Sequence, residues 1–233
     1  LDQQTNKQQK SKKTDQGRYL AKDKGEKKKS TKSKSNYNPG CGGWVFKILV
    51  VFFMTMAFIE FLSLRSKDRN FILWAFFGIC YVCVGLSSLL VLRSIDNELN
   101  SYFTLMLFCG VTLNDTFAYI FGSLIGGKKI APSISPNKTY AGLFGGLIAS
   151  IAFILLFDRF VFDLSIGDQC MFVLIFSIVG FLGDLLESFL KRQANVKDSS
   201  RLLMGHGGAL DRVDSLILTS PLTLLYVIGQ YLL

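Results

Sequence analysis

Apolar residues in this chain gather into six near-continuous blocks separated by short polar stretches. A block of about 20 apolar residues is long enough to cross the hydrocarbon core of a bilayer. Inside lipid only helices and closed barrels satisfy every backbone polar group, and these blocks lack the alternation of barrel strands. The pattern therefore predicts an all-α, polytopic helical membrane protein with about six transmembrane helices: Trp44–Leu64, Phe71–Leu92, Tyr102–Ile125, Ala141–Phe157 (with room to continue to Phe162), Gln169–Leu190 and Ser215–Leu233.

The net charge of +9 is concentrated at the N-terminal end of the chain. Residues 1–43 hold 12 Lys or Arg against four Asp or Glu, and very few large apolar residues. Such a segment cannot bury enough apolar surface to fold, so we expect a disordered basic tail at 1–43 and a membrane-embedded domain at 44–233. The tail is expected to be solvated near anionic lipid and to bind no nucleic acid, because only Tyr19 and Tyr37 offer stacking rings.

Basic residues alternate between the predicted loops, which hold three, one, three, one and five Lys or Arg in chain order. Basic loops stay in the cytosol, so the first, third and fifth loops are expected on the cytosolic face of a bacterial inner (cell) membrane. The same alternation places the basic tail outside, which conflicts with its charge. We therefore expect either that a first span is missing, through truncation, an altered reading frame or divergence, or that Trp44–Leu64 is only half inserted.

Charged residues concentrate between the fifth and sixth blocks, in the run Ser188–Asp214. This run contains Lys191, Arg192, Lys197, the only histidine (His206), Gly207, Gly208, Asp211, Arg212 and Asp214. Charges placed among membrane spans are costly, so we interpret them as functional. At helical spacing Asp184, Ser188 and Lys191 share one face of the fifth block, and Asp211 and Asp214 share a face if the last helix begins near them.

The run resembles the signature of the phosphatidate cytidylyltransferases, also called CDP-diacylglycerol synthases. In that family CTP and phosphatidate give CDP-diacylglycerol and pyrophosphate. The likeness covers roughly Gly42 to the end of the chain and includes a second motif group, from Asn114 to Thr139. It departs from the family pattern at Met204 and Ala209, and at Ala141, where the family often has Glu.

The resemblance implies that Asp184, Asp211 and Asp214 hold Mg²⁺, with K⁺ as an accompanying ion, and that these residues and Lys191 are catalytic. Carboxylate oxygens and substrate phosphates are the ligands that Mg²⁺ prefers. We assign substrate binding to Ser188, Arg192, Lys197, His206, Gly207, Gly208, Arg212, Asp115, Ser135 and Lys138. The expected partners are CTP, phosphatidate and membrane lipid, and a homodimer is left open.

Two alternatives stay open at this point. A CTP-dependent lipid kinase of the polyprenol or phytol type shares a membrane site and an anionic donor, but the residues from His206 to Arg212 favour the cytidylyltransferase. An ion transporter with Asp115, Asp184 and Asp214 along its pathway would usually show internal repeats, and the chain has none.

Overall fold

The computed structural model describes residues 41–65, 70–99, 102–161, 164–196, 199 and 207–231. Lys197, His206 and most of the predicted tail lie outside these residues. Within them, six helices are long and apolar enough to cross a membrane: Gly43–Ser63, Phe71–Asp96, Phe103–Leu124, Tyr140–Phe160, Ile166–Gln193 and Leu210–Gln230. All six expected spans are therefore confirmed, and the chain is a multi-pass helical membrane protein.

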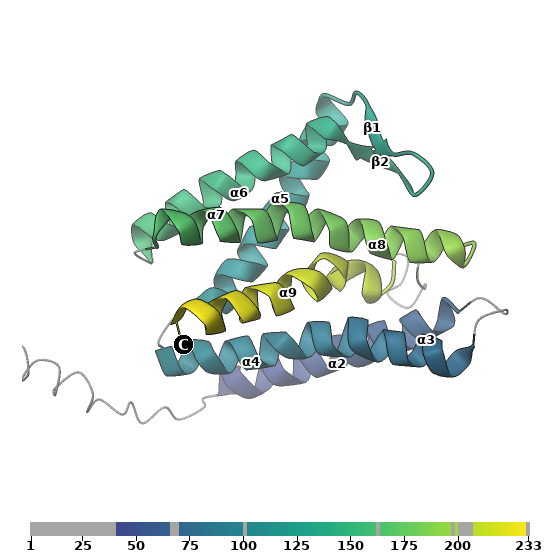
Figure 1. The fold of residues 1–233 in the computed structure, drawn as a ribbon, viewed down its shortest axis with the longest axis horizontal. Helices are drawn as coiled ribbons and strands as arrows, with labels where there is room; N and C mark the ends of the chain where they lie inside the picture. The colour runs from purple at the N-terminus through teal and green to yellow at the C-terminus, as the bar shows by residue number, and fades with distance from the viewer. Residues whose placement is uncertain are drawn as a thin grey trace, which may run out of the picture. The chain divides into compact units, whose positions relative to one another are not determined.

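The helices and strands follow one another along the chain as shown in Figure 1. They are α2 (Cys41–Ser63), α3 (Phe71–Gly78), the π-helical turn η1 (Ile79–Cys83), α4 (Val84–Leu99), α5 (Phe103–Leu124), β1 (Lys129–Ala131), β2 (Ser135–Thr139), α6 (Tyr140–Phe160), α7 (Ile166–Leu174), the π-helical turn η2 (Ile175–Val179), α8 (Gly180–Gln193) and α9 (Leu210–Tyr231). The second and fifth spans thus each contain a π turn, a feature that is frequent at functional sites.

The loop predicted between the third and fourth spans contains an antiparallel β-hairpin. Lys129 pairs with Thr139, and Ala131 pairs with Ser135. Gly126 and Gly127 precede the first strand with φ of +66° and +92°, a left-handed conformation that glycine adopts without steric cost. The hairpin adds a small two-stranded sheet to the helical fold and carries Ser135 and Lys138 toward the helices.

Several helices begin at a side chain that accepts a hydrogen bond from a free backbone N–H of the first turn. Asn70 caps α3, Thr139 caps α6, and Ser165 forms a capping box with Asp168 at α7. Asp96 accepts from the N–H groups of Phe103 and Thr104 at 2.9 and 2.8 Å, at the start of α5. These caps satisfy donors that no intrahelical carbonyl can reach, which matters most in an apolar solvent.

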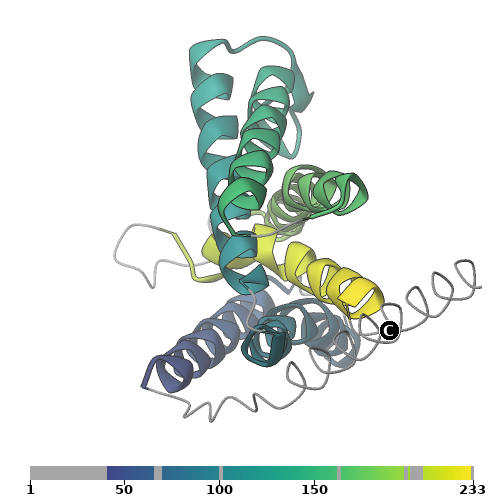
Figure 2. The ribbon, with the colours of Figure 1, turned by 90° about the vertical axis from the view of Figure 1, so that its left-hand side faces the viewer.

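Helix α9 lies between α8 and α4, as both ribbon views show (Figures 1 and 2). Glycines permit the close approach on either side. A Cβ built at Gly183 of α8 would lie 2.7 Å from the Asp214 carbonyl oxygen, and one at Gly85 of α4 would lie 2.6 Å from the Ile217 carbonyl oxygen. Small residues at helix contacts are the usual means of tight packing in membranes.

The last span begins at Leu210, five residues before the start expected from hydrophobicity. Asp211 and Asp214 therefore belong to the first turns of α9. A hydropathy pattern marks where a helix becomes apolar, and it does not report a polar helical turn that side-chain contacts hold in place. The contacts that hold this turn belong to the candidate active site.

Candidate active site

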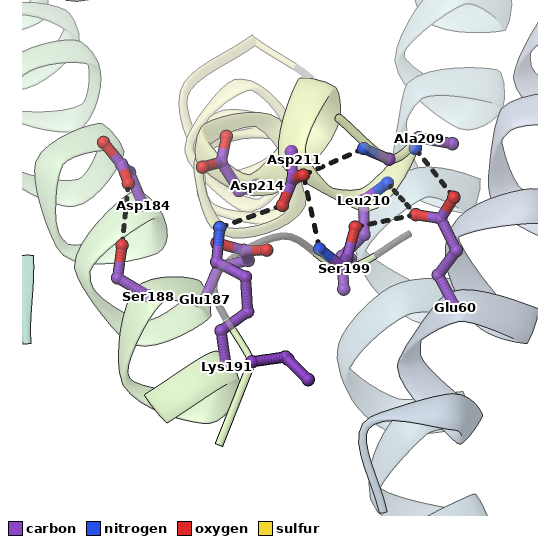
Figure 3. A network of polar contacts seen from close by, with 12 residues as sticks. Glu60, Asp184, Glu187, Ser188, Lys191, Ser199, Ala209, Leu210, Asp211 and Asp214 are labelled. Carbon is purple, nitrogen blue, oxygen red and sulfur yellow. Dashed lines mark hydrogen bonds and ion pairs between the residues drawn. The ribbon is translucent and has the colours of Figure 1, made fainter. Parts of the chain in front are cut away.

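Three carboxylates from two helices form one acidic group beside the start of α9. Each of Asp184, Glu187 and Asp214 offers an oxygen within 4.8 Å of the others. Asp184 and Glu187 are three residues apart on α8 and lie near Asp214 of α9 (Figure 3). The absence of a side chain at Gly183 is what lets the two backbones come close enough for this meeting.

Glu187 is the most enclosed member of the acidic group, with a side chain that is 0% exposed. Its Oε2 lies 2.6 Å from Lys191 Nζ, but neither of its oxygens accepts a well-directed hydrogen bond from the described residues. Buried carboxylate oxygens with unused lone pairs are costly unless a charged partner is present. The candidate ligand atoms of the acidic group are all carboxylate oxygens, and those of Glu187 accept no well-directed hydrogen bond from the described residues. Such a set of ligand atoms fits a hard divalent cation.

Asp211 lies next to this group and makes different contacts. Its Oδ1 accepts from Lys191 Nζ at 2.9 Å. Its Oδ2 accepts from the backbone N–H of Gly208 at 2.9 Å and from that of Ser199 at 3.5 Å. Asp211 thus holds the loop before α9 and fixes Lys191 between two carboxylates. The expected metal role of Asp211 stays a prediction, while Asp184 and Asp214 are brought together as expected.

A pocket of about 210 Å³ brings the second motif group, from Asn114 to Thr139, together with Asp184. Its wall comes from α5, the hairpin, α6, η2 and α8, and it includes Asp115, Ser135, Lys138, Ser177 and Asp184. These residues lie far apart in the sequence, so the fold brings the third loop and the fifth span together at this pocket. The pocket also links Asp184, a member of the acidic group, with the hairpin.

Lys138 of the hairpin supplies the positive charge at this pocket. Its Nζ lies 2.8 Å from Asp184 Oδ2, donates to the Phe181 carbonyl oxygen at 3.2 Å, and lies 4.4 Å from the centre of the Phe181 ring. Ser188 Oγ donates to Asp184 Oδ1 at 3.4 Å. Asp184 therefore connects the expected phosphate contacts Lys138 and Ser188 with the acidic group.

Asp115 is held at the pocket by a polar network inside the helices. Its Oδ2 accepts from Ser215 Oγ of α9, and its Oδ1 accepts from Asn114 Nδ2, both at 3.1 Å. Asn114 Oδ1 in turn accepts from the fully buried Ser150 of α6 at 3.3 Å. A Cβ at Gly146 would lie 2.6 Å from Asn114 Oδ1, so this glycine leaves the room that the amide occupies.

The remaining expected substrate contacts among the described residues are Arg192, Arg212, Gly207 and Gly208. Arg192 is exposed, and its Nε donates to the Ile134 carbonyl oxygen at 3.1 Å, which ties the end of α8 to the hairpin turn. Arg212 is exposed in the first turn of α9. Gly207 has a φ of +83°, where a side chain would be strained, and Gly208 offers its N–H to Asp211.

The comparisons with known proteins agree on one family. The model of the Cytidylyltransferase family matches residues 35–229. The chain belongs to this family. A protein of Staphylococcus haemolyticus named phosphatidate cytidylyltransferase is 42% identical over 186 residues, which cover 78% of this chain and 70% of the relative. Proteins of the same name from Staphylococcus saprophyticus and Staphylococcus aureus are 41% and 40% identical over the same coverage.

Two carboxylates of this cytidylyltransferase-family chain were missed in the sequence. Glu187 stands three residues after Asp184, and that spacing alone would have placed it on the same face. Glu60 is an isolated carboxylate within the first apolar block, and a charge at such a position is a signal of function by itself. In the structure Glu60 is 2% exposed and contacts the start of α9 (Figure 3).

Proposed function

We propose that this chain is a phosphatidate cytidylyltransferase, which transfers CMP from CTP to phosphatidate and releases CDP-diacylglycerol and pyrophosphate. The observation that carries the proposal is the acidic group of Asp184, the buried Glu187 and Asp214, which adjoins a pocket with Lys138 at the end of membrane-spanning helices. The curated relatives with this name support the choice of substrates.

In the proposed reaction a phosphate oxygen of phosphatidate attacks the α-phosphorus of CTP. The bond between that phosphorus and the oxygen of the β-phosphate breaks, and pyrophosphate leaves with the electron pair. The nucleophile is already an anion near neutral pH, so the site needs charge neutralisation and alignment more than a strong base. We propose that Lys138 and Ser135, which line the pocket, orient phosphate oxygens, together with Ser188, which donates to Asp184.

The residues of the acidic group fit a divalent cation, and we propose Mg²⁺ with Asp184, Glu187 and Asp214 as its protein ligands. When bound, such a cation supplies positive charge that shields the phosphates from the carboxylates and from each other. Lys191, fixed between Glu187 and Asp211, contributes a permanent positive charge to the same place.

We place the site on the cytosolic face of a bacterial inner membrane, because CTP is cytosolic and because the first, third and fifth loops hold more Lys and Arg than the other two. An accompanying K⁺, a homodimer and the absence of a nucleic-acid partner stay predictions. The roles of Lys197 and His206 stay predictions as well, since both residues lie outside the described part of the chain.

Membranes that carry this chain, incubated with phosphatidate, Mg²⁺ and CTP labelled at the α- or the γ-phosphate, test the function. We expect α-label, and no γ-label, in the lipid phase, with loss of transfer in Asp214→Asn. Transfer of the γ-label would identify a lipid kinase instead. If no label is transferred to any lipid acceptor, the proposed enzymatic function is refuted.

A further inference from the structure

Glu60 of α2 connects the first described span to the start of α9. Its carboxylate accepts from the backbone N–H of Ala209 at 3.0 Å and from that of Leu210 at 2.8 Å. It also accepts from Ser199 Oγ at 3.0 Å. The carboxylate thus caps a helix that begins about 150 residues later in the chain, and helix N-termini favour such a negative charge.

The capped segment is the one that carries the acidic residues of the site. Ala209 and Leu210 directly precede Asp211, and Asp214 follows one turn later. Glu60 and Asp211 hold the same loop from two sides, because Ser199 donates its hydroxyl to Glu60 and its backbone N–H to Asp211. A side chain at Gly208 would collide with Ser199 and Glu60, so Gly208 and Ser199 fit closely around the carboxylate.

Glu60 itself is rigidly placed. Its neighbour Phe61 is fully buried and stacks on Trp74 of α3 with ring centres 4.7 Å apart. Trp74 Nε1 donates to the Phe61 carbonyl oxygen at 3.0 Å, which fixes the last turns of α2. Contacts with α3 therefore fix the end of α2, and Glu60 at this end binds the start of α9.

We propose that Glu60 is a positioning residue for the cation site, which fixes the first turn of α9 so that Asp214 stays within reach of Asp184 and Glu187. The effect of Glu60 on catalysis follows from this inference only together with the proposed function. Glu60 lies outside the acidic group and the pocket, and it acts through the backbone of Ala209 and Leu210. The span that contains Glu60 thereby supports the active site without lining it.

Asp96 offers a matched control within the same chain. It is also 2% exposed, and it caps α5 through the backbone N–H groups of Phe103 and Thr104. The capped helix contributes Asp115 to the site, twelve residues after Phe103 and so about three turns from its start. Loss of this cap should therefore weaken the fold without disturbing the acidic group.

The test compares Glu60→Gln with Asp96→Asn in the full chain, purified into lipid nanodiscs. A glutamine keeps the shape, but its NH₂ group replaces an acceptor and leaves one backbone N–H unmet. Three quantities are measured: Mn²⁺ affinity by electron paramagnetic resonance, the Mg²⁺ concentration for half-maximal CMP transfer, and the unfolding temperature. The first of these needs no substrate and no turnover.

For Glu60→Gln we expect both the Mn²⁺ dissociation constant and the Mg²⁺ requirement to rise about tenfold, the usual effect of losing a residue that orients metal ligands. For Asp96→Asn we expect a lower unfolding temperature with a Mn²⁺ affinity within about twofold of the parent. Glu60→Asp, which keeps the charge, should lie between the parent and Glu60→Gln. If Glu60→Gln does not fold, Ser199→Ala removes one contact and should shift Mn²⁺ affinity about threefold.

Unchanged Mn²⁺ affinity in both Glu60→Gln and Ser199→Ala, or an equal loss of affinity in Asp96→Asn, would overturn the inference. If the parent chain binds Mn²⁺ but transfers no cytidylyl group to phosphatidate, the proposed function fails while the role of Glu60 is still decided by the binding data. The two failures are thus distinguishable.

Discussion

At the scale of single residues, the acidic group depends on Glu187, whose side chain is fully buried. Burial of a carboxylate lowers the stability of the fold, so stability alone does not explain this residue. Replacing Glu187 with Gln keeps the volume and removes a buried charge, while Lys191 keeps Asp211 as a partner. We expect Mn²⁺ affinity to fall at least about tenfold in Glu187→Gln without a lower unfolding temperature of the metal-free protein. Titration with Mn²⁺ and thermal unfolding check this, and unchanged affinity would exclude Glu187 as a ligand.

Two tyrosines give opposite expectations for the loss of a hydroxyl group. Tyr81 in η1 is buried, and its hydroxyl finds no hydrogen-bond partner among the described residues. Tyr226 in α9 donates to Asp168 Oδ1 at 2.6 Å. Tyr81→Phe should leave the unfolding free energy unchanged or raise it by up to about 1 kcal/mol, while Tyr226→Phe should lower it by about 1–3 kcal/mol. Unfolding of both variants in the same detergent measures the difference, and a destabilised Tyr81→Phe would contradict the expectation.

At the scale of helices, the site depends on how closely α8 approaches α9. A methyl group at Gly183 would lie 2.7 Å from the Asp214 carbonyl oxygen, so Gly183→Ala must push the two helices apart. We expect this variant to lose about 1–3 kcal/mol of stability and to bind Mn²⁺ about tenfold more weakly. The measurements are thermal unfolding and Mn²⁺ titration.

Gly229, at the other end of α9, is the matched control for this change. A Cβ at Gly229 would have no atom within 4 Å, so Gly229→Ala should create no steric clash. Its expected effect on stability is the higher helix propensity of Ala, up to about 1 kcal/mol. Its Mn²⁺ affinity should equal that of the parent. Equal Mn²⁺ affinities in Gly183→Ala and Gly229→Ala would show that the close approach of α8 to α9 does not determine the geometry of the acidic group.

Much of the helical pattern was readable from the sequence because membrane spans need long apolar runs, which local composition reports directly. The turns η1 and η2 were not readable, since both lie inside apolar runs and no residue type marks them. The hairpin was missed because its strands are only three and five residues long. The contact of Glu60 with Leu210 spans 150 residues of sequence, and local spacing carries no record of it.

At the scale of the whole molecule, the contacts at the site join three loop regions on one face. Glu60, near the first loop, contacts Ala209, near the fifth, and Arg192 contacts Ile134 in the third. These loops hold the larger counts of Lys and Arg, three, three and five against one and one, which is typical of the cytosolic side. The site and the basic loops should therefore be accessible from the cytosol alone.

Single cysteines on the two faces test this orientation. Ser133 in the hairpin turn and Val161 after α6 are both exposed, and they lie at opposite ends of the fourth span. A membrane-impermeant maleimide should label Ser133→Cys only in inverted vesicles and Val161→Cys only in intact cells, above the background of the parent chain. The parent is the required control, because Cys80 and Cys170 are exposed in the structure and belong to apolar spans that we expect to face lipid. Labelling of Ser133→Cys in intact cells would place the site outside, where CTP is not supplied, and would contradict the proposed orientation.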